Sequence, residues 1–263
     1  MNERKKTEQP VCHTFESLAG IPGLVQSVFT RHGGVSAPPY SSLNVAWNNG
    51  DSPDAVGENL MRVKKTLRME HLVSGLQVHG ATINEVDEQT LAGGERHGPV
   101  VLAPPGDALV TKLRGVGLMI KIADCQAIFL VDPGRGVIAN IHSGWRGSVQ
   151  GLPAKVVQFL HERFGCRPRD LYAAVSPSLG PCCGEFRNYR EELPPSFWPF
   201  QSSPQYFDFW AISRWQLVEA GLRPERIEVA ERCTVCETHD FFSYRGERTT
   251  GRMAAVIGWK EER

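Results

Sequence analysis

The sequence predicts an α+β domain in which helices pack on mixed β-sheets in layers. Short β-type runs outnumber the helical segments, and they follow one another in series instead of alternating strictly with helices. Three of these runs, within residues 116–142, are almost entirely apolar, as in strands that are covered on both faces. A chain of 263 residues can bury a sizeable core. Together these observations favour a layered mixed-sheet fold over a doubly wound one.

The first elements are a strand and a helix. Residues 23–36 predict a strand that runs into a Gly-Gly turn. Residues 50–67 predict a loop and then a helix that begins near Asp54, which is a candidate N-cap. The helix is predicted from apolar residues at helical spacing, namely Val56, Leu60, Val63 and Leu67.

Strands dominate the middle of the chain. Six β-type runs lie between residues 81 and 142, separated mostly by Gly, Pro or Asp. The stretch IADCQAIFLVD, residues 122–132, predicts a buried strand that carries Asp124 and Cys125 side by side. A buried strand normally excludes both a carboxylate and a reactive thiol, so this pair suggests a functional use.

The C-terminal half contains two helices and three further strands. An amphipathic helix is predicted within 148–164, and Pro153 is tolerable only near its first turn, so its regular part can start later than residue 148. A second helix is predicted at 209–222. The strands are predicted at 171–180 and in the stretches RIEVA and MAAVIG.

Composition narrows the class of protein. Lys plus Arg equals Asp plus Glu, 29 against 29, and no basic stripe stands out, which argues against nucleic acid as the main partner. No apolar run is long enough to span a membrane, and residues 1–12 lack the apolar region of a signal peptide. We therefore expect a cytoplasmic protein with a disordered lead-in, residues 1–12, and one catalytic domain, residues 13–263. Neither a dinucleotide-binding nor a P-loop motif occurs.

Three residues at predicted strand ends form a candidate metal site. His79, Cys125 and His142 would offer two imidazoles and a thiolate, a good zinc set that leaves one position open for water, which zinc would activate. Copper accepts the same ligands. A metal-free alternative uses the same atoms, with Cys125 as nucleophile, either His as its base and Asp124 as the orienting acid.

Two other groups of residues have candidate roles. Cys182, Cys183, Cys233 and Cys236 would suit a structural zinc, but adjacent cysteines have a poor bite for one tetrahedral ion, which favours a site-lining or structural thiol role. Cys12 and Cys166 have no motif context. The arginines that could hold a phosphate or carboxylate are Arg31, Arg146, Arg245, Arg248 and Arg252.

Ten ordered motifs between residues 30 and 252 give the chain a resemblance to a known family. They are TRHGGVS, PYSSLNV, GDSPDAVGEN, QVHG, DALVT, ADCQAI, HSGWRG, GPCCGEF, CTVC and FFSYRGERTTGR. The chain resembles the YfiH-type family, long labelled multicopper polyphenol oxidase or laccase-domain proteins. The resemblance implies an αββα layered fold similar to that of toxin-type cysteine deamidases. It also implies that His79, Cys125 and His142 are the catalytic and metal-binding set.

The resemblance further implies an activity on purine nucleosides. The implied reactions are phosphorolysis of adenosine, inosine, guanosine and methylthioadenosine, and deamination of adenosine, with zinc or copper as cofactor and phosphate as co-substrate. Asp124 would serve as an acid or base, and the implied substrate-binding residues are Arg31, Asn44, Arg146, Arg245 and Arg252. The alternatives are a metal-free Cys-His hydrolase or amidase, a copper-dependent polyphenol oxidase, and a non-catalytic metal-binding protein.

The chain departs from the family pattern at four positions. Ala127 replaces a common Pro, and Ser143 replaces the usual Ala. Asn48 stands where relatives often have His, and Gly246 replaces an Arg that commonly follows Arg245. The His79, Cys125 and His142 set is intact.

Overall fold

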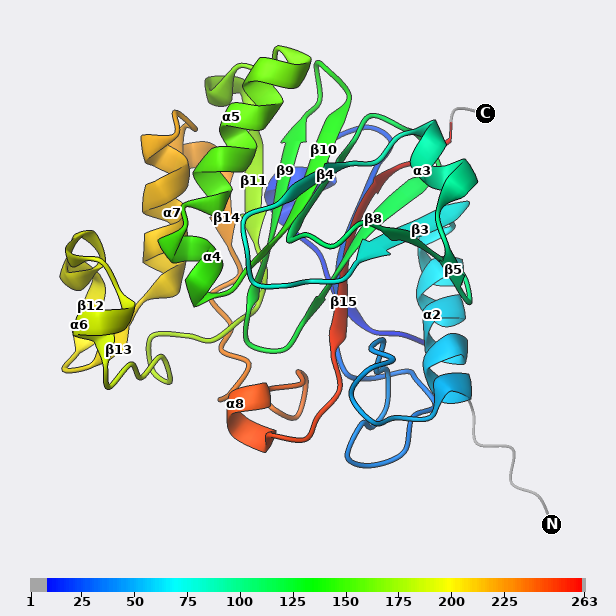
Figure 1. Cartoon of the computed structure of the whole chain (residues 1–263), viewed down its shortest axis with the longest axis horizontal. Helices are drawn as coiled ribbons and strands as arrows, with labels where there is room; N and C mark the ends of the chain where they lie inside the picture. Colours follow the sequence, from blue (N-terminus) through cyan, green and yellow to red (C-terminus); the bar gives the residue numbers. More distant parts are fainter. Residues whose placement is uncertain (1–8, 262–263) are drawn as a thin grey trace.

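In the computed structural model of the protein, which describes residues 9–261, two β-sheets lie face to face between two layers of helices (Figure 1). The seven-stranded sheet contains, in spatial order, β1 (Cys12–His13), β2 (Leu24–Phe29), β15 (Met253–Trp259), β8 (Val116–Ile122), β3 (His71–Gly75), β6 (Val100–Ala103) and β5 (Arg96–His97). The six-stranded sheet contains β14 (Ile227–Val229), β11 (Tyr172–Val175), β9 (Gln126–Asp132), β10 (Val137–Ser143), β7 (Ala108–Thr111) and β4 (Ile83–Glu85). A small third sheet pairs β12 (Gln201–Ser203) with β13 (Tyr206–Phe207).

Both large sheets mix parallel and antiparallel pairs. In the seven-stranded sheet, β3 is parallel to β6 and β8, and the other pairs are antiparallel. In the six-stranded sheet, β14 with β11 and β4 with β7 are parallel, and the central pairs are antiparallel. The predicted α+β fold with mixed sheets is confirmed, whereas the similarity to toxin-type cysteine deamidases stays a prediction.

The helices cover the outer faces of the two sheets. The long ones are α2 (Pro53–Leu67), which packs on the seven-stranded sheet, and α5 (Leu152–Phe164) and α7 (Phe209–Glu219), which pack on the six-stranded sheet (Figure 1). The short ones are α1 (Glu16–Ala19), α3 (Glu88–Gly93), α4 (Trp145–Val149), α6 (Tyr189–Glu192) and α8 (Tyr244–Glu247). Among the described residues, no helix has both the length and the apolar character needed to cross a bilayer.

Strand β9 shows why the central strands are apolar throughout. Phe129 and Val131 belong to the core between the two sheets, whereas Ile128 and Leu130 pack with α5 and α7. Successive side chains of a strand point to opposite faces, so a strand covered on both faces buries every residue. Helix α2 buries the predicted stripe of Val56, Leu60, Val63 and Leu67.

Two helix predictions need correction at their boundaries. The N-cap of α2 is Ser52, and Asp54 lies inside the first turn, so the predicted cap is wrong. The helical stretch at 148–164 consists of α4 and α5, which are separated at Gly151 by a left-handed backbone with φ 68°. Pro153 occupies the first turn of α5, as predicted.

The prediction that residues 122–132 form one strand is wrong. β8 ends at Ile122 in one sheet and β9 begins at Gln126 in the other, so Asp124 and Cys125 lie in the bend that crosses between the sheets. Asp124 has φ 83° there, a left-handed conformation that is uncommon for residues other than Gly. The acid and the thiol therefore lie between the ends of two interior strands, outside regular strand pairing.

Two further differences concern the ends and the middle of the chain. Most of the predicted lead-in, residues 1–8, lies outside the described residues, but Cys12 already pairs with Phe29 in the sheet. Strand β3 was not predicted, because its short sequence HLVSG lacks a clear alternation. It is nevertheless buried, since it pairs on both sides within the seven-stranded sheet.

Candidate functional site

Three segments that are distant in sequence meet at the bend between the sheets. His79 lies in the loop after β3, Cys125 lies in the bend, and His142 is the second-last residue of β10. The ligand atoms of the three side chains all lie within 4.8 Å of one another. The two imidazole rings have centroids 4.9 Å apart and an interplanar angle of 76°. The structure thus brings together the three residues that the sequence singled out.

Asp107 supports two of these residues, and sequence reasoning missed it. Its carboxylate is fully buried at the start of β7 and accepts a hydrogen bond from His142 Nδ1 at 2.8 Å. It also accepts hydrogen bonds from the backbone N–H groups of Val78 (3.3 Å), His79 (2.9 Å) and Gly80 (2.7 Å). One carboxylate therefore orients the His142 ring and holds the loop that carries His79. The sequence signal that could have identified Asp107 is the acid of DALVT, a charged residue directly before an apolar strand.

The charges of these groups reinforce one another. Burial raises the pKa of Cys125, but the charge of His142 and hydrogen bonds from both imidazoles lower it to about 6. Burial lowers the pKa of His142, but Cys125 and Asp107 raise it to about 9. Burial also raises the pKa of Asp107, which its bonds to His142 and Gly80 nevertheless hold below the usual value. At neutral pH, the metal-free site therefore favours a thiolate beside an imidazolium.

Gly144 leaves the space that this cluster needs. A Cβ atom at Gly144 would lie 3.0 Å from Cys125 Sγ and 3.4 Å from His79 Cδ2. The glycine has an ordinary extended backbone, so the constraint is steric and comes from close approach to the thiol. A side chain at this position would press on two of the three candidate ligands.

Asp124 is held by its own hydrogen bonds. Its Oδ1 accepts from Thr234 Oγ1 and Ser243 Oγ, both at 2.7 Å, and its Oδ2 accepts from the backbone N–H of Arg245 at 2.6 Å. Its backbone carbonyl accepts from Leu179 at 2.8 Å. These contacts tie the Cys125 bend to two neighbouring segments, which is the arrangement of a positioning residue.

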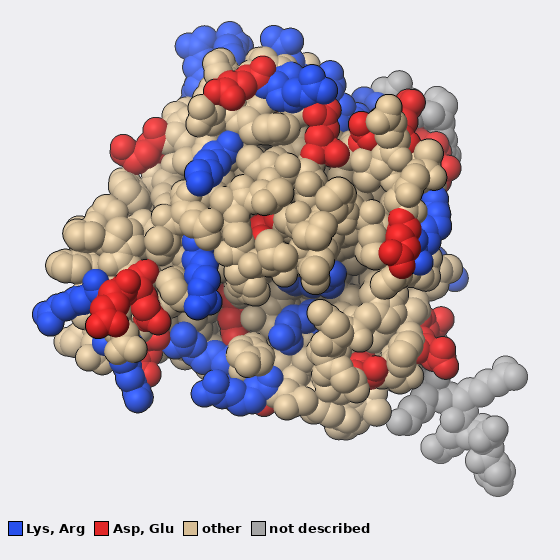
Figure 2. Space-filling view, in the orientation of Figure 1, with Lys and Arg blue, Asp and Glu red and all other residues tan. Residues whose placement is uncertain are grey.

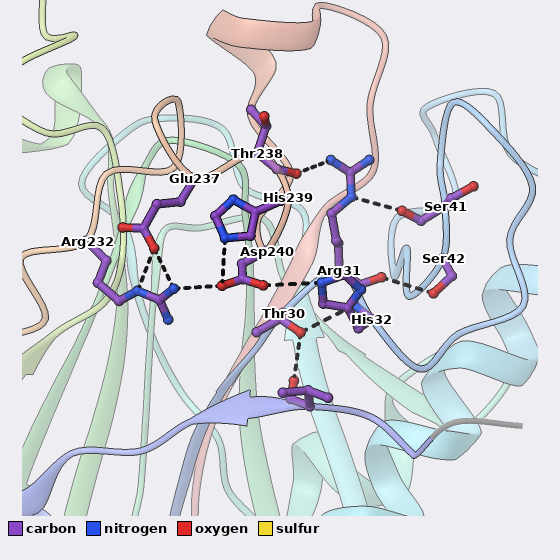
Figure 3. Close-up of polar contacts among 11 residues, drawn as sticks. Thr30, Arg31, His32, Ser41, Ser42, Arg232, Glu237, Thr238, His239 and Asp240 are labelled. Atoms are coloured by element: carbon purple, nitrogen blue, oxygen red, sulfur yellow. Dashed lines mark hydrogen bonds and ion pairs between the residues drawn. The ribbon is translucent and has the colours of Figure 1, made fainter.

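The candidate arginines differ in how many of their donors the protein already uses. Arg31 donates to the backbone carbonyls of Thr238 and Ser41 (Figure 3). It also donates to Glu247 Oε1 at 2.9 Å, and its guanidinium lies over the Phe242 ring. Arg245 donates to two backbone carbonyls, at 3.3 and 2.8 Å. Arg31 is thus committed to joining protein segments.

Arg252 has a different environment. It is half-buried and its Nη1 donates only to the carbonyls of Thr250 and Gly251, and within residues 9–261 no carboxylate forms an ion pair with it. Burial lowers its pKa, and the negative charges of Cys125 and Asp124 oppose that effect. In the view of Figure 2, Lys and Arg side chains gather around a hollow in the lower half of the molecule, near α8. Arg252 is thus the candidate best placed to meet an anion beside Cys125.

The remaining predicted residues fall into two groups. Arg146 and Arg248 are exposed, the first of them over the Trp145 ring. Asn44 is fully buried, and its Oδ1 accepts from the backbone N–H of Arg252 at 2.8 Å, while its Nδ2 donates to Asp51 at 2.8 Å. Asn44 therefore lies behind Arg252 and positions its backbone.

Two of the departures from the family pattern have a local explanation. The backbone N–H of Ala127 donates to Ser176 Oγ at 2.9 Å, a bond that a proline cannot make. The hydroxyl of Ser143 lies 3.1 Å from that of Ser148 in α4. Asn48 has no side-chain hydrogen bond among the described contacts, and Gly246 has no side chain, so nothing in the structure explains these two changes.

Comparisons with known proteins identify relatives that match almost the full length of the chain. Purine nucleoside phosphorylase YlmD of Geobacillus stearothermophilus is 38% identical over 253 residues, which cover 91% of this chain and 92% of that protein. Purine nucleoside phosphorylase YfiH of Escherichia coli is 31% identical, over 89% and 93% of the two chains. The crystal structure of the Geobacillus YlmD superposes with a TM-score of 0.84 at 33% identity, over 98% of each chain. That of a Bacillus licheniformis YfiH protein gives 0.81 at 29% identity, over 90% and 93% of the two chains.

These relatives share the fold over almost their full length. The model of the family described as multi-copper polyphenol oxidoreductase laccase matches residues 25–260, a range that contains the whole site. The chain therefore belongs to this laccase-domain family, together with the YfiH and YlmD proteins.

Proposed function

We propose that the protein is a purine nucleoside phosphorylase whose active site is built on His79, Cys125 and His142. The observation that carries the proposal is the convergence of these three side chains beside Arg252, a half-buried cation that has no carboxylate partner among the described residues. The names of the relatives supply the reaction class. The substrates that we propose are adenosine, inosine, guanosine and methylthioadenosine.

The donor set fits a zinc ion. Two imidazoles and a thiolate with a depressed pKa are ligands that zinc prefers, and the Asp107–His142 contact is the carboxylate–histidine pair that commonly supports such sites. The space that Gly144 leaves beside Cys125 also fits. When bound, zinc would supply Lewis-acid polarisation of a substrate atom. We propose zinc, with copper as the other metal that suits these ligands.

The protein's own residues would position phosphate and the nucleoside. In phosphorolysis, a phosphate oxygen forms a bond to C1′ of the ribose while the bond from C1′ to the purine nitrogen breaks, and the purine leaves with a proton. Arg252 would bind the phosphate with its planar guanidinium. Asn44 and Asp124 would act as positioning residues, since one holds the Arg252 backbone and the other holds the Cys125 bend.

The activity can be tested with purified protein, adenosine and phosphate. We expect adenine and ribose 1-phosphate as products, and no turnover by Cys125→Ala. Inosine or hypoxanthine as an additional product would reveal the deamination of adenosine that we propose as a second activity of the same site. Absence of any product above the Cys125→Ala background would rule out the proposal.

The role of Arg252 is tested separately. Loss of a charge-assisted hydrogen bond costs about 1.5–3 kcal/mol, so Arg252→Gln should raise the KM for phosphate roughly 10- to 100-fold. The KM for adenosine should change much less. Arg163→Gln is the matched control, because Arg163 is an exposed arginine of α5 that pairs with Glu85. Equal effects of the two substitutions would contradict the assignment.

A second candidate function has a specific observation in its favour. Cys125, His142 and Asp107 form a thiolate, imidazolium and carboxylate in hydrogen-bonded sequence, which is the arrangement of a thiol hydrolase or amidase. Zinc analysis separates the candidates, because a thiolate bound to metal is not a free nucleophile. Loss of one equivalent of zinc per chain in His79→Ala would favour the phosphorylase.

The donor set also bears on the family's laccase label. A multicopper oxidase binds several coppers through many histidines. Among the described residues, only one cluster, that of His79, Cys125 and His142, contains two imidazoles. A copper-dependent polyphenol oxidase is therefore the weaker proposal.

A further inference from the structure

Four cysteines outside the candidate active site lie together at the surface. The Sγ atoms of Cys182, Cys183, Cys233 and Cys236 all lie within 4.8 Å of one another. Cys236 Sγ is 3.4 Å from Cys182 Sγ and 3.6 Å from Cys183 Sγ, and all four thiols are free. A disulfide would require a sulfur–sulfur distance of about 2.05 Å. Four ligands bound to zinc at about 2.3 Å in a tetrahedron have sulfurs about 3.8 Å apart, and the observed distances of 3.4 and 3.6 Å are close to this value.

The two segments that carry the cysteines are joined by backbone contacts. Ser178 donates to the carbonyl of Arg232 at 3.1 Å, and Thr234 donates to the carbonyl of Ser178 at 3.0 Å. Gly180 allows the close approach, because a Cβ there would lie 3.0 Å from Cys233 Cβ and 2.8 Å from the Trp210 ring. The cysteines are therefore held together by the fold before any ligand binds.

The Cys233–Cys236 turn has the features of a metal-binding turn. The backbone N–H of Gly180 donates to Cys233 Sγ at 3.3 Å. Such bonds stabilise a thiolate. The turn is closed by Arg232, which donates to Glu237 at 2.9 Å and to Asp240 at 2.7 Å (Figure 3).

Adjacent cysteines have a poor bite for one tetrahedral ion, but a local turn changes the directions of Cys182 and Cys183 in this chain. Cys182 and Cys183 lie in a tight turn in which the N–H of Cys183 donates to the carbonyl of Gly180 at 3.0 Å. This turn directs both sulfurs toward Cys236. The spacing of the residues along the chain gave no indication of this, because the turn geometry decides where the side chains point.

We propose that Cys182, Cys183, Cys233 and Cys236 bind a zinc ion in a closed, structural site. Four thiolates in a tetrahedron favour zinc, and four protein ligands leave no position for substrate. Zinc binding would release the protons of the thiols, and no oxidation or reduction is involved.

This zinc site would stabilise two segments that lie next to the candidate active site. The carbonyls of Cys183 and Glu185 accept from Arg245 Nη1, and Thr234, between two of the cysteines, donates to Asp124 beside Cys125. The metal would thus hold the two segments that support the Cys125 bend. The zinc assignment itself does not depend on the proposed phosphorylase activity.

The test is the metal content of the full-length protein, purified under reducing conditions in the presence of zinc. Cys182→Ser/Cys236→Ser should lose one equivalent of zinc per chain relative to wild type, whatever His79 and its partners bind. Cys12→Ser is the matched control and should lose none, because Cys12 lies outside both clusters. His79→Ala should keep the equivalent of zinc that the Cys182→Ser/Cys236→Ser variant loses.

A spectroscopic readout does not depend on the folding of the cysteine double variant. Wild-type protein loaded with cobalt should show an intense thiolate-to-cobalt charge-transfer band, and His79→Ala should retain it. Stepwise modification of wild-type thiols should release this zinc as the four cysteines react. The proposal is overturned if the double variant retains the wild-type zinc content, if His79→Ala abolishes the cobalt band, or if the four thiols are found as disulfides without metal.

Discussion

Asp107→Asn is the substitution that tests the candidate site most directly, because one buried carboxylate bonds the His142 ring and the backbone of the loop that carries His79. Asp107 Oδ1 accepts from His142 Nδ1 and the His79 N–H, and Oδ2 accepts from the N–H groups of Val78 and Gly80. Asparagine has one oxygen and one NH2 group. In either orientation of the amide, two N–H donors therefore face a donor instead of an acceptor.

The magnitude follows from the bonds that are lost. The amide should keep its oxygen toward His142, and its NH2 group then faces the short 2.7 Å bond from Gly80 and the longer 3.3 Å bond from Val78. An unsatisfied buried donor costs about 1–3 kcal/mol, and loss of the charge on the remaining His142 bond adds to this, so we expect about 3 kcal/mol of destabilisation. Because the loss of such a supporting carboxylate costs roughly 10- to 100-fold in metal affinity, zinc should bind correspondingly more weakly.

The assay combines zinc competition against a chromophoric chelator with denaturant unfolding of the metal-free protein. Asp132→Asn is the matched control, since Asp132 is also buried but lies at the opposite end of β9 and accepts a backbone bond from Arg135. The control should leave the affinity for zinc unchanged. Wild-type affinity and stability in Asp107→Asn, or equal losses in the two variants, would refute the reasoning.

Two further predictions concern Gly144 and Cys125. Gly144→Ala places a methyl group 3.0 Å from Cys125 Sγ, and overpacking of about 1–3 kcal/mol should weaken zinc binding roughly 5- to 100-fold in the chelator competition. Gly147→Ala, whose nearest neighbour is 3.6 Å away, should not, and a loss of similar size there would contradict the steric explanation. In metal-free protein, the rate of Cys125 alkylation, followed by peptide mass spectrometry, should fall as the pH is lowered through about 6, because protonation removes the thiolate. A midpoint near the ordinary thiol value of about 8.5 would show that His142 does not stabilise the thiolate.

Much of the fold could be predicted because its signals are local. The apolar runs that form β8, β9 and β10 identify strands covered on both faces, and the stripe of α2 identifies its buried face. Where local signals were weak or ambiguous, the predictions failed. β3 was missed because its burial comes from pairing with β6 and β8, and the turn between β8 and β9 was missed because apolar residues continue on both sides of it.

The sequence by itself determined which side chains could carry chemistry: His79, Cys125 and His142, the arginines of the C-terminal segment, and the four clustered cysteines. Only the tertiary structure decided how they are used. It placed Asp107 where its carboxylate bonds the His142 ring and the His79 backbone, and it engaged the Asp124 carboxylate in hydrogen bonds. It paired Arg31 with Glu247, and it brought Cys182 and Cys183 close to Cys236. The physical reason is that the chemistry of a side chain and the periodicity of a segment are properties of the local chain. Contacts between distant segments depend instead on how the two sheets pack and where the chain turns between them.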